Sequence, residues 1–149
     1  MRPLFEPLNP NYKEHLMQGF ASQRVMETIG AYLISVEPGQ VDIGLDFRED
    51  LTQQHGYLHA GIVTTIADSA CGFAAYSLMP MGSGVLTVEY KVNLLSPARG
   101  EKFIATGRVI KPGRTLTVCV GDVYAFEGEE RRQIAMMQAT MIRLAEKEA

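Results

Sequence analysis

Hydrophobic and polar residues alternate along two segments of the chain, 41–47 and 86–94. A period of two predicts β-strands that have one buried and one solvent-exposed face. On this pattern, Thr87 and Glu89 point away from the apolar face of the second strand. The apolar positions are Val41, Ile43, Leu45 and Phe47 in the first segment and Leu86, Val88, Tyr90, Val92 and Leu94 in the second.

Four further segments are predicted as strands because they are rich in β-forming residues and are bounded by turn residues. They cover residues 28–36, 101–111, 115–126 and 131–144. Turns rich in Pro, Gly and charged residues separate them, at Pro38-Gly39, 111–114 and 127–130. Prolines punctuate the first ten positions, and residues 11–23 are predicted as a short amphipathic helix.

The longest apolar segment, 60–79, is predicted as a buried helix. A membrane span is disfavoured because Asp68 falls near its middle, at a cost of about 2.5–3.5 kcal/mol. An antiparallel sheet must bury its apolar face on something, and this helix is the apolar partner that the chain offers. We therefore predict an α+β fold, with a curved antiparallel sheet of five to six strands around one long helix. It would form a single domain over 1–149, with an N-terminal helical extension over about 1–26.

The composition and charge of the chain argue against several classes of protein. Among the 149 residues, 46% are hydrophobic and 21% charged, as in an ordinary globular protein. The net charge of −3 argues against a general nucleic-acid binder. Two cysteines, Cys71 and Cys119, do not make a disulfide framework, and the N-terminal residues lack the apolar core of a signal peptide. A cytoplasmic location is expected.

Asp68 is the most unusual residue of the predicted helix, because a carboxylate inside an apolar helix is costly unless it is paired or functional. A helical projection places it on a face of small residues. It lies nine positions after His59, about 13.5 Å along the axis and on the opposite side. If both residues act in one reaction, they therefore come from two chains. The alternatives are an Asp68 satisfied by neighbouring Thr hydroxyls or by a polar group of a partner, and a His59 that only caps the helix or fills a turn. The small face comprises Gly61, Thr64, Thr65, Cys71, Gly72 and Ala75.

The start of this helix carries a second chemical possibility. First-turn N–H groups lack intrahelical acceptors and lie at the positive end of the helix dipole. The amides of Ala60 and Gly61 are therefore candidates to stabilise an oxyanion. A metal site at His55 and His59 is disfavoured because Gly56 interrupts the helical spacing, and Cys71 is disfavoured as a nucleophile because Asp68 discourages its thiolate.

The combined pattern resembles the hotdog-fold acyl-CoA thioesterases, and within them the phenylacetate-pathway (PaaI-like) type. The resemblance covers roughly residues 27–144. It is carried by the motifs His59-Ala60-Gly61, Asp68 in an apolar helix, Thr-Val-Glu-Tyr at 87–90 and Leu-Ser-Pro-Ala-Arg-Gly at 95–100.

The resemblance implies a role for five residues in thioester hydrolysis. Asp68 would be the nucleophile or the base that activates water, and the Ala60 N–H would polarise the thioester carbonyl. His59, Gln53 and Thr87 would support these groups. In the family the carboxylate comes from the opposite subunit to the amide donor, which implies a homodimer, with a dimer of dimers as an open alternative. Ala60 stands where the family usually has Gly.

Substrate binding is expected at Gly56, Gly61 and Thr65, and coenzyme A phosphates at basic residues. Lys91, Arg99 and Arg114 are the candidates, with Arg114 on its Pro-Gly-Arg turn the best placed; an ordinary solvated surface is the alternative. No metal or other cofactor is required. Two rival functions remain, a non-catalytic acyl-CoA-binding module and an enoyl-CoA hydratase on the same fold.

Overall fold

The structure, a computed structural model, describes residues 4–145. The predicted single domain also includes 1–3 and 146–149, which lie outside the described residues. Three α-helices, a 3-10 helix and six strands follow one another along the chain. Their order is α1 (Tyr12–Ser22), α2 (Arg24–Ile29), β1 (Tyr32–Glu37), β2 (Gln40–Asp46), η1 (Glu49–Leu51), α3 (Ala60–Tyr76), β3 (Gly84–Leu94), β4 (Lys102–Lys111), β5 (Leu116–Glu127) and β6 (Glu130–Leu144).

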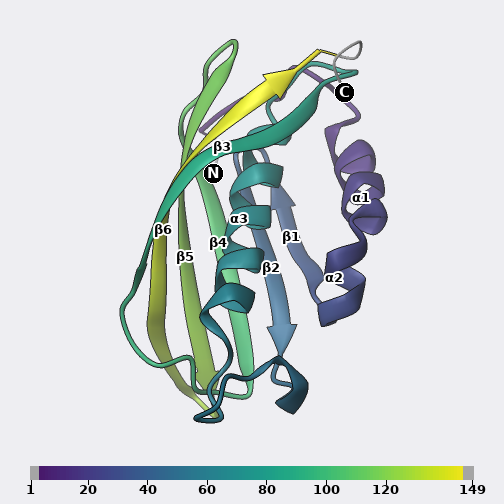
Figure 1. Cartoon of the computed structure of the whole chain (residues 1–149). Helices are drawn as coiled ribbons and strands as arrows, with labels where there is room; N and C mark the ends of the chain where they lie inside the picture. The colour runs from purple at the N-terminus through teal and green to yellow at the C-terminus, as the bar shows by residue number, and fades with distance from the viewer. Residues whose placement is uncertain (1–3, 146–149) are drawn as a thin grey trace.

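All six strands join one antiparallel sheet in the order β1-β2-β4-β5-β6-β3. The sheet curves around α3, while α1 and α2 lie to one side of that helix (Figure 1). This confirms the predicted architecture of a long helix wrapped by an antiparallel sheet. No helix within residues 4–145 has the length and apolar character needed to cross a membrane.

Helix α3 approaches the sheet closely through small residues. A Cβ on Gly107 of β4 would lie 2.3 Å from the backbone of Ala70, and one on Gly121 would lie 3.0 Å from Cys71 Sγ. Cys71 and Ala75, two members of the predicted small-residue face, are both fully buried within the protomer.

The N-terminal region contains a helix that the sequence pattern did not predict. Thr28 and Ile29 belong to α2 and not to the strand expected over 28–36. Gly30 ends α2 in the left-handed conformation, with φ +78°, which glycine adopts without steric cost. Strand β1 therefore begins only at Tyr32.

A β-bulge changes the predicted faces of β3. The register of β3 against β6 shifts between Thr87 and Glu89. As a result, Thr87 faces α3, where its hydroxyl reaches Asp68. The predicted strict alternation, with Thr87 turned away from the apolar face, was wrong because one extra residue at a bulge reverses the side-chain direction.

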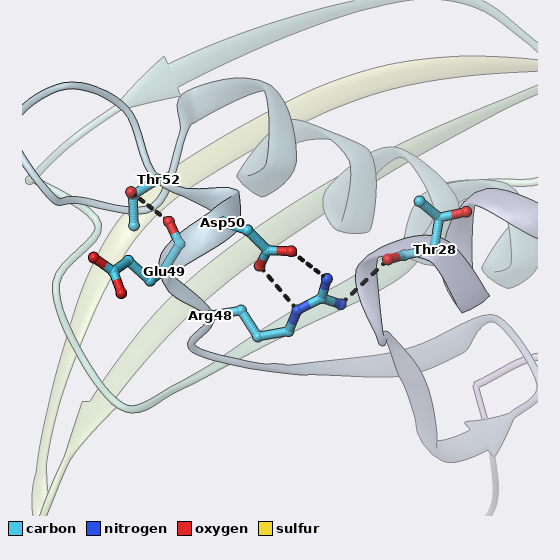
Figure 2. Close-up of polar contacts among 5 residues, drawn as sticks. All are labelled: Thr28, Arg48, Glu49, Asp50 and Thr52. Atoms are coloured by element: carbon cyan, nitrogen blue, oxygen red, sulfur yellow. Dashed lines mark hydrogen bonds and ion pairs between the residues drawn. The ribbon is translucent and has the colours of Figure 1, made fainter.

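Arg48 connects α2 to the loop that leads to α3 (Figure 2). Its guanidinium donates to Asp50 Oδ1 and Oδ2, at 3.0 and 2.7 Å, and to the backbone oxygen of Thr28, at 3.2 Å. Thr52 Oγ1 donates to the Glu49 carbonyl at 2.6 Å. These bonds fix the segment before Gln53 against the C-terminal end of α2.

Candidate active site

The N-terminus of α3 presents one unoccupied amide. His59 is the N-cap, and its Nδ1 accepts a 2.8 Å hydrogen bond from the Gly61 N–H. The N–H groups of Ile62 and Val63 donate to the His59 carbonyl. Among the described residues, the Ala60 N–H has no protein acceptor. The capping role considered for His59 is therefore present, and it occupies the Gly61 amide while the Ala60 amide stays available.

Gln53 lines the same hollow as Ala60. Its Oε1 accepts from the backbone N–H of His55, at 2.6 Å, and of Tyr57, at 3.3 Å. The turn is completed by Gly56, at φ +84°. Because the side-chain oxygen is occupied by the turn, the Gln53 amide nitrogen is left as a donor. Gln53 and Ala60 line one hollow of about 460 Å³, together with Tyr57, Leu58, Val63, Leu94, Leu95, Ser96, Pro97, Ala98 and Ile134; we call it the Ala60 hollow.

Asp68 lies on the other side of α3. It is partly buried, and its Oδ1 accepts a 2.7 Å hydrogen bond from Thr87 Oγ1. The hydroxyls of Thr64 and Thr65 donate instead to carbonyls of their own helix. Within residues 4–145, Oδ2 of Asp68 receives no hydrogen bond from the protein. The carboxylate is thus held by one strand residue and keeps one oxygen available as an acceptor.

Two hollows flank Asp68, and we call them the Asp68 hollows. One, of about 80 Å³, is lined by Gln23, Asp68, Ser69, Gly72, Phe73, Val85, Leu86, Thr87 and Met141. The other, of about 370 Å³, is lined by Gln23, Val25, Gly61, Thr64, Thr65, Asp68, Ser69, Tyr90 and Val92. Neither contains Ala60 or Gln53. One chain therefore brings Gln53 to Ala60 and Thr87 to Asp68, but it does not bring the two pairs into one cavity.

The basic residues expected to bind phosphate do not form one patch. Arg99 Nε lies 3.8 Å from Glu127, and Lys91 is exposed on β3. Arg114 lies elsewhere, in a pocket of about 400 Å³ near the C-terminal end of α3. This Arg114 pocket also contains Arg143 and one acidic residue, Glu6, and its apolar walls include Phe5, Leu8, Ala75, Leu78, Met79 and Pro80.

The two cysteines are buried, unbridged thiols. Burial raises the pKa of Cys119 to about 12, and burial is also the main cause that raises the pKa of Cys71, with a smaller contribution from Asp68. Neither thiol is a thiolate near neutral pH. Among residues 4–145, no group of three or more His, Cys, Asp or Glu side chains is placed to hold a metal ion.

Three residues of these cavities were missed by sequence reasoning. Gln23 sits between two helices, Tyr57 in a turn and Arg143 on β6, and no local motif marks any of them. Of the three, only Arg143 carried a signal, because its charge was visible near the end of an apolar strand. Arg143 lies near Arg114 because β5 pairs with β6.

Comparison with known proteins identifies the family and the fold. Residues 55–131 match the family model described as the thioesterase superfamily. A crystal structure of a thioesterase family protein from Silicibacter pomeroyi is 51% identical, with a TM-score of 0.89, and the match covers 90% of this chain and 98% of that one. The PaaI protein of E. coli, from the phenylacetic acid degradation operon, is 16% identical with a TM-score of 0.82 over 93% of this chain and 96% of its own, and shows the same fold.

A human protein named acyl-coenzyme A thioesterase 13 is 33% identical over 85 residues, 56% of this chain and 60% of that protein. The fold and the matching family model define a hotdog-fold thioester hydrolase. The chain belongs to the thioesterase superfamily.

Proposed function

We propose that the chain hydrolyses acyl-CoA thioesters at a site shared by two copies of itself. The observation that carries this is the separation of two complementary half-sites on α3. The free Ala60 amide and Gln53 line one hollow, whereas Asp68 and Thr87 line others. Ala60 and Asp68 are eight residues apart, about 12 Å along the helix axis, which is too far for both to contact one carbonyl.

In the assembled site, the thioester oxygen accepts hydrogen bonds from the Ala60 N–H and from the Gln53 amide. Asp68 of the other protomer drives attack on the carbonyl carbon, and the electrons of the C=O bond move to the oxygen that these donors stabilise. Collapse of the tetrahedral intermediate breaks the C–S bond and releases CoA thiol. Thr87 holds Asp68 Oδ1, and His59 holds the helix start, so both act as positioning residues.

Strand β3 supports self-association. It is an edge strand of 11 residues, and Leu86 and Val88 are 55% and 54% exposed. A long apolar edge presents unpaired N–H and C=O groups that favour pairing with another strand. Antiparallel pairing of β3 with its copy would also place the two α3 helices side by side. A tetramer and the cytoplasmic location stay predictions.

The Arg114 pocket suits the phosphates of coenzyme A. Arg114 and Arg143 supply two guanidinium groups, which recognise phosphate through paired hydrogen bonds. Ala75, which lines the pocket, lies seven residues beyond Asp68 on α3, about 10 Å along the axis. A pantetheine arm can bridge such a span. Lys91 and Arg99 have weaker support because neither shares a cavity with α3 among the described hollows.

The two rival functions make different predictions. A binding module needs no carboxylate with an available oxygen, and Asp68 has one. A hydratase would act on the double bond of an enoyl-CoA and leave the thioester intact. Release of free thiol, followed beside enoyl absorbance over a panel of acyl-CoAs, separates the three activities.

Two substitutions test the proposal. Asp68→Asn keeps the shape but removes the base, and we expect kcat to fall about 10²–10⁴-fold. Ala60→Pro replaces the amide hydrogen with a ring carbon. The helix should tolerate it, since proline is accepted at the first position of a helix and His59 already has the extended conformation that proline requires before it.

For Ala60→Pro we expect a loss of about 10²–10³ in kcat. Glu129→Gln, in the exposed β5–β6 turn, is the control and should match the wild type. Full hydrolysis by Asp68→Asn would refute the assignment.

A further inference from the structure

Gln23 connects the N-terminal helices to α3 directly beside Asp68. Ser69 Oγ donates a 2.9 Å hydrogen bond to Gln23 Oε1, and Ser69 is 8% exposed. Gln23 is the residue between α1 and α2, and its backbone N–H donates to the Phe20 carbonyl. The side chain therefore starts from a fixed backbone and ends on the residue that follows Asp68.

The frame that carries Gln23 is packed at both ends. The Phe20 ring of α1 lies 5.8 Å from the Phe73 ring of α3, centroid to centroid. The C-terminal end of α2 is held by Arg48, which donates to the Thr28 carbonyl (Figure 2). Such support from packing and hydrogen bonds is what a positioned functional group requires.

The hydrogen bond from Ser69 determines which end of the Gln23 carboxamide is available. A carboxamide has one acceptor oxygen and an NH₂ group with two donors. The oxygen is occupied by Ser69, while Gln23 Nε2 has no protein acceptor within residues 4–145. Gln23 and Asp68 both line each of the two Asp68 hollows.

A residue with a free donor and a residue with a free acceptor thus line the same hollows. Asp68 Oδ1 is held by Thr87, which leaves Oδ2 to accept. A water molecule between the two groups would accept from Gln23 Nε2 and donate to Asp68 Oδ2, and its remaining lone pair would point to the substrate. Ser69 and Thr87 would fix the two sides of this arrangement.

We propose that Gln23 positions the attacking water, which assigns Asp68 the role of general base. This inference rests on the proposed function and deepens it. The water oxygen forms a bond to the carbonyl carbon, its proton moves to Asp68 Oδ2, and the C=O electron pair moves to oxygen. When the C–S bond breaks, its electron pair leaves on sulfur, and the thiolate takes the proton back from Asp68.

Two variants separate water positioning from a merely structural link. Gln23→Glu keeps an oxygen that accepts from Ser69 but replaces the NH₂ donor with a second acceptor. Gln23→Ala removes both. If Gln23 positions water, each variant lowers kcat about tenfold, as expected for one neutral hydrogen bond made in the transition state, and leaves KM within about twofold. If Gln23 is only a structural link, Gln23→Glu keeps wild-type kcat, which would overturn the inference.

The pH profile gives an independent readout. Asp68 and Tyr90 are the ionisable side chains among the residues that line the two hollows, and the Cys71 thiol is buried behind them. A carboxylate at position 23 would repel ionised Asp68, so the acidic limb of kcat/KM should move to higher pH in Gln23→Glu. An unmoved limb contradicts the inference.

Controls distinguish this inference from the proposed function itself. Gln18→Ala alters an exposed glutamine of the same helical segment and should match the wild type. Thermal unfolding of each variant checks that the fold is kept. Loss of activity in Asp68→Asn with full activity in both Gln23 variants would refute only the role of Gln23. Full activity in Asp68→Asn would refute the proposed function.

Discussion

The hydrogen bond from Thr87 to Asp68 allows a quantitative test of how the carboxylate is held. Thr87→Val has nearly the same shape but lacks the hydroxyl that donates over 2.7 Å to Asp68 Oδ1. A hydrogen bond to a charged group contributes about 1.5–3 kcal/mol. Because Asp68 is only partly buried, water replaces part of the lost bond, and the lower end of the range applies. This corresponds to a loss of about tenfold in kcat/KM.

The assay is thiol release from an acyl-CoA. In Thr87→Val the carboxylate loses the donor that holds Oδ1, so kcat/KM should fall. Thr87→Ser keeps the hydroxyl and should keep the rate. The reasoning is refuted if Thr87→Val, shown to be folded, matches the wild-type kcat/KM.

Three further predictions concern stability and substrate binding. Gly107→Ala should destabilise the fold by about 3 kcal/mol or more in urea unfolding, because its Cβ would lie 2.3 Å from the Ala70 backbone. The control is Gly72→Ala, whose Cβ meets nothing within 4 Å. It should stabilise the helix by about 0.5–1 kcal/mol. Arg114→Gln should raise KM for acyl-CoA but not for the matching acyl-pantetheine, which lacks the nucleotide; equal effects on both would contradict the phosphate contact. The free energy of unfolding should fall above about pH 8.5, because the thiols ionise in the unfolded chain while the buried Cys71 and Cys119 stay protonated in the folded one. The expected slope is about 1.4 kcal/mol per thiol per pH unit. A variant with alanine at both positions should lack this pH dependence.

Local periodicity was enough to predict most of the fold. Strands β2, β4, β5 and β6 were predicted within one residue at each end because alternation and turn residues are local signals. Helix α2 has only six residues, too short for helical periodicity to show. The bulge after Thr87 was equally invisible, because its extra residue is defined only by the register with β6.

The candidate site was predictable to a smaller extent. Asp68 and Ala60 stand out by their types and positions in an apolar helix, and both prove to line hollows. Gln23 is 45 residues before Asp68, and only the packing of α1 on α3 brings the two together. The spatial relation of the basic residues also depends on the fold: Arg114 and Arg143 line one pocket, whereas Arg108 pairs with Asp122 at 2.8 Å.

The most direct test of a shared site is complementation between two inactive chains. Asp68→Asn and Ala60→Pro chains, carrying different affinity tags, are co-expressed, and the mixed dimer is purified through both tags. If each site takes Asp68 from one protomer and the Ala60 amide from the other, one of its two sites is intact, and the dimer should show about half the wild-type rate. If both groups of a site come from one chain, the mixed dimer will be as inactive as either parent.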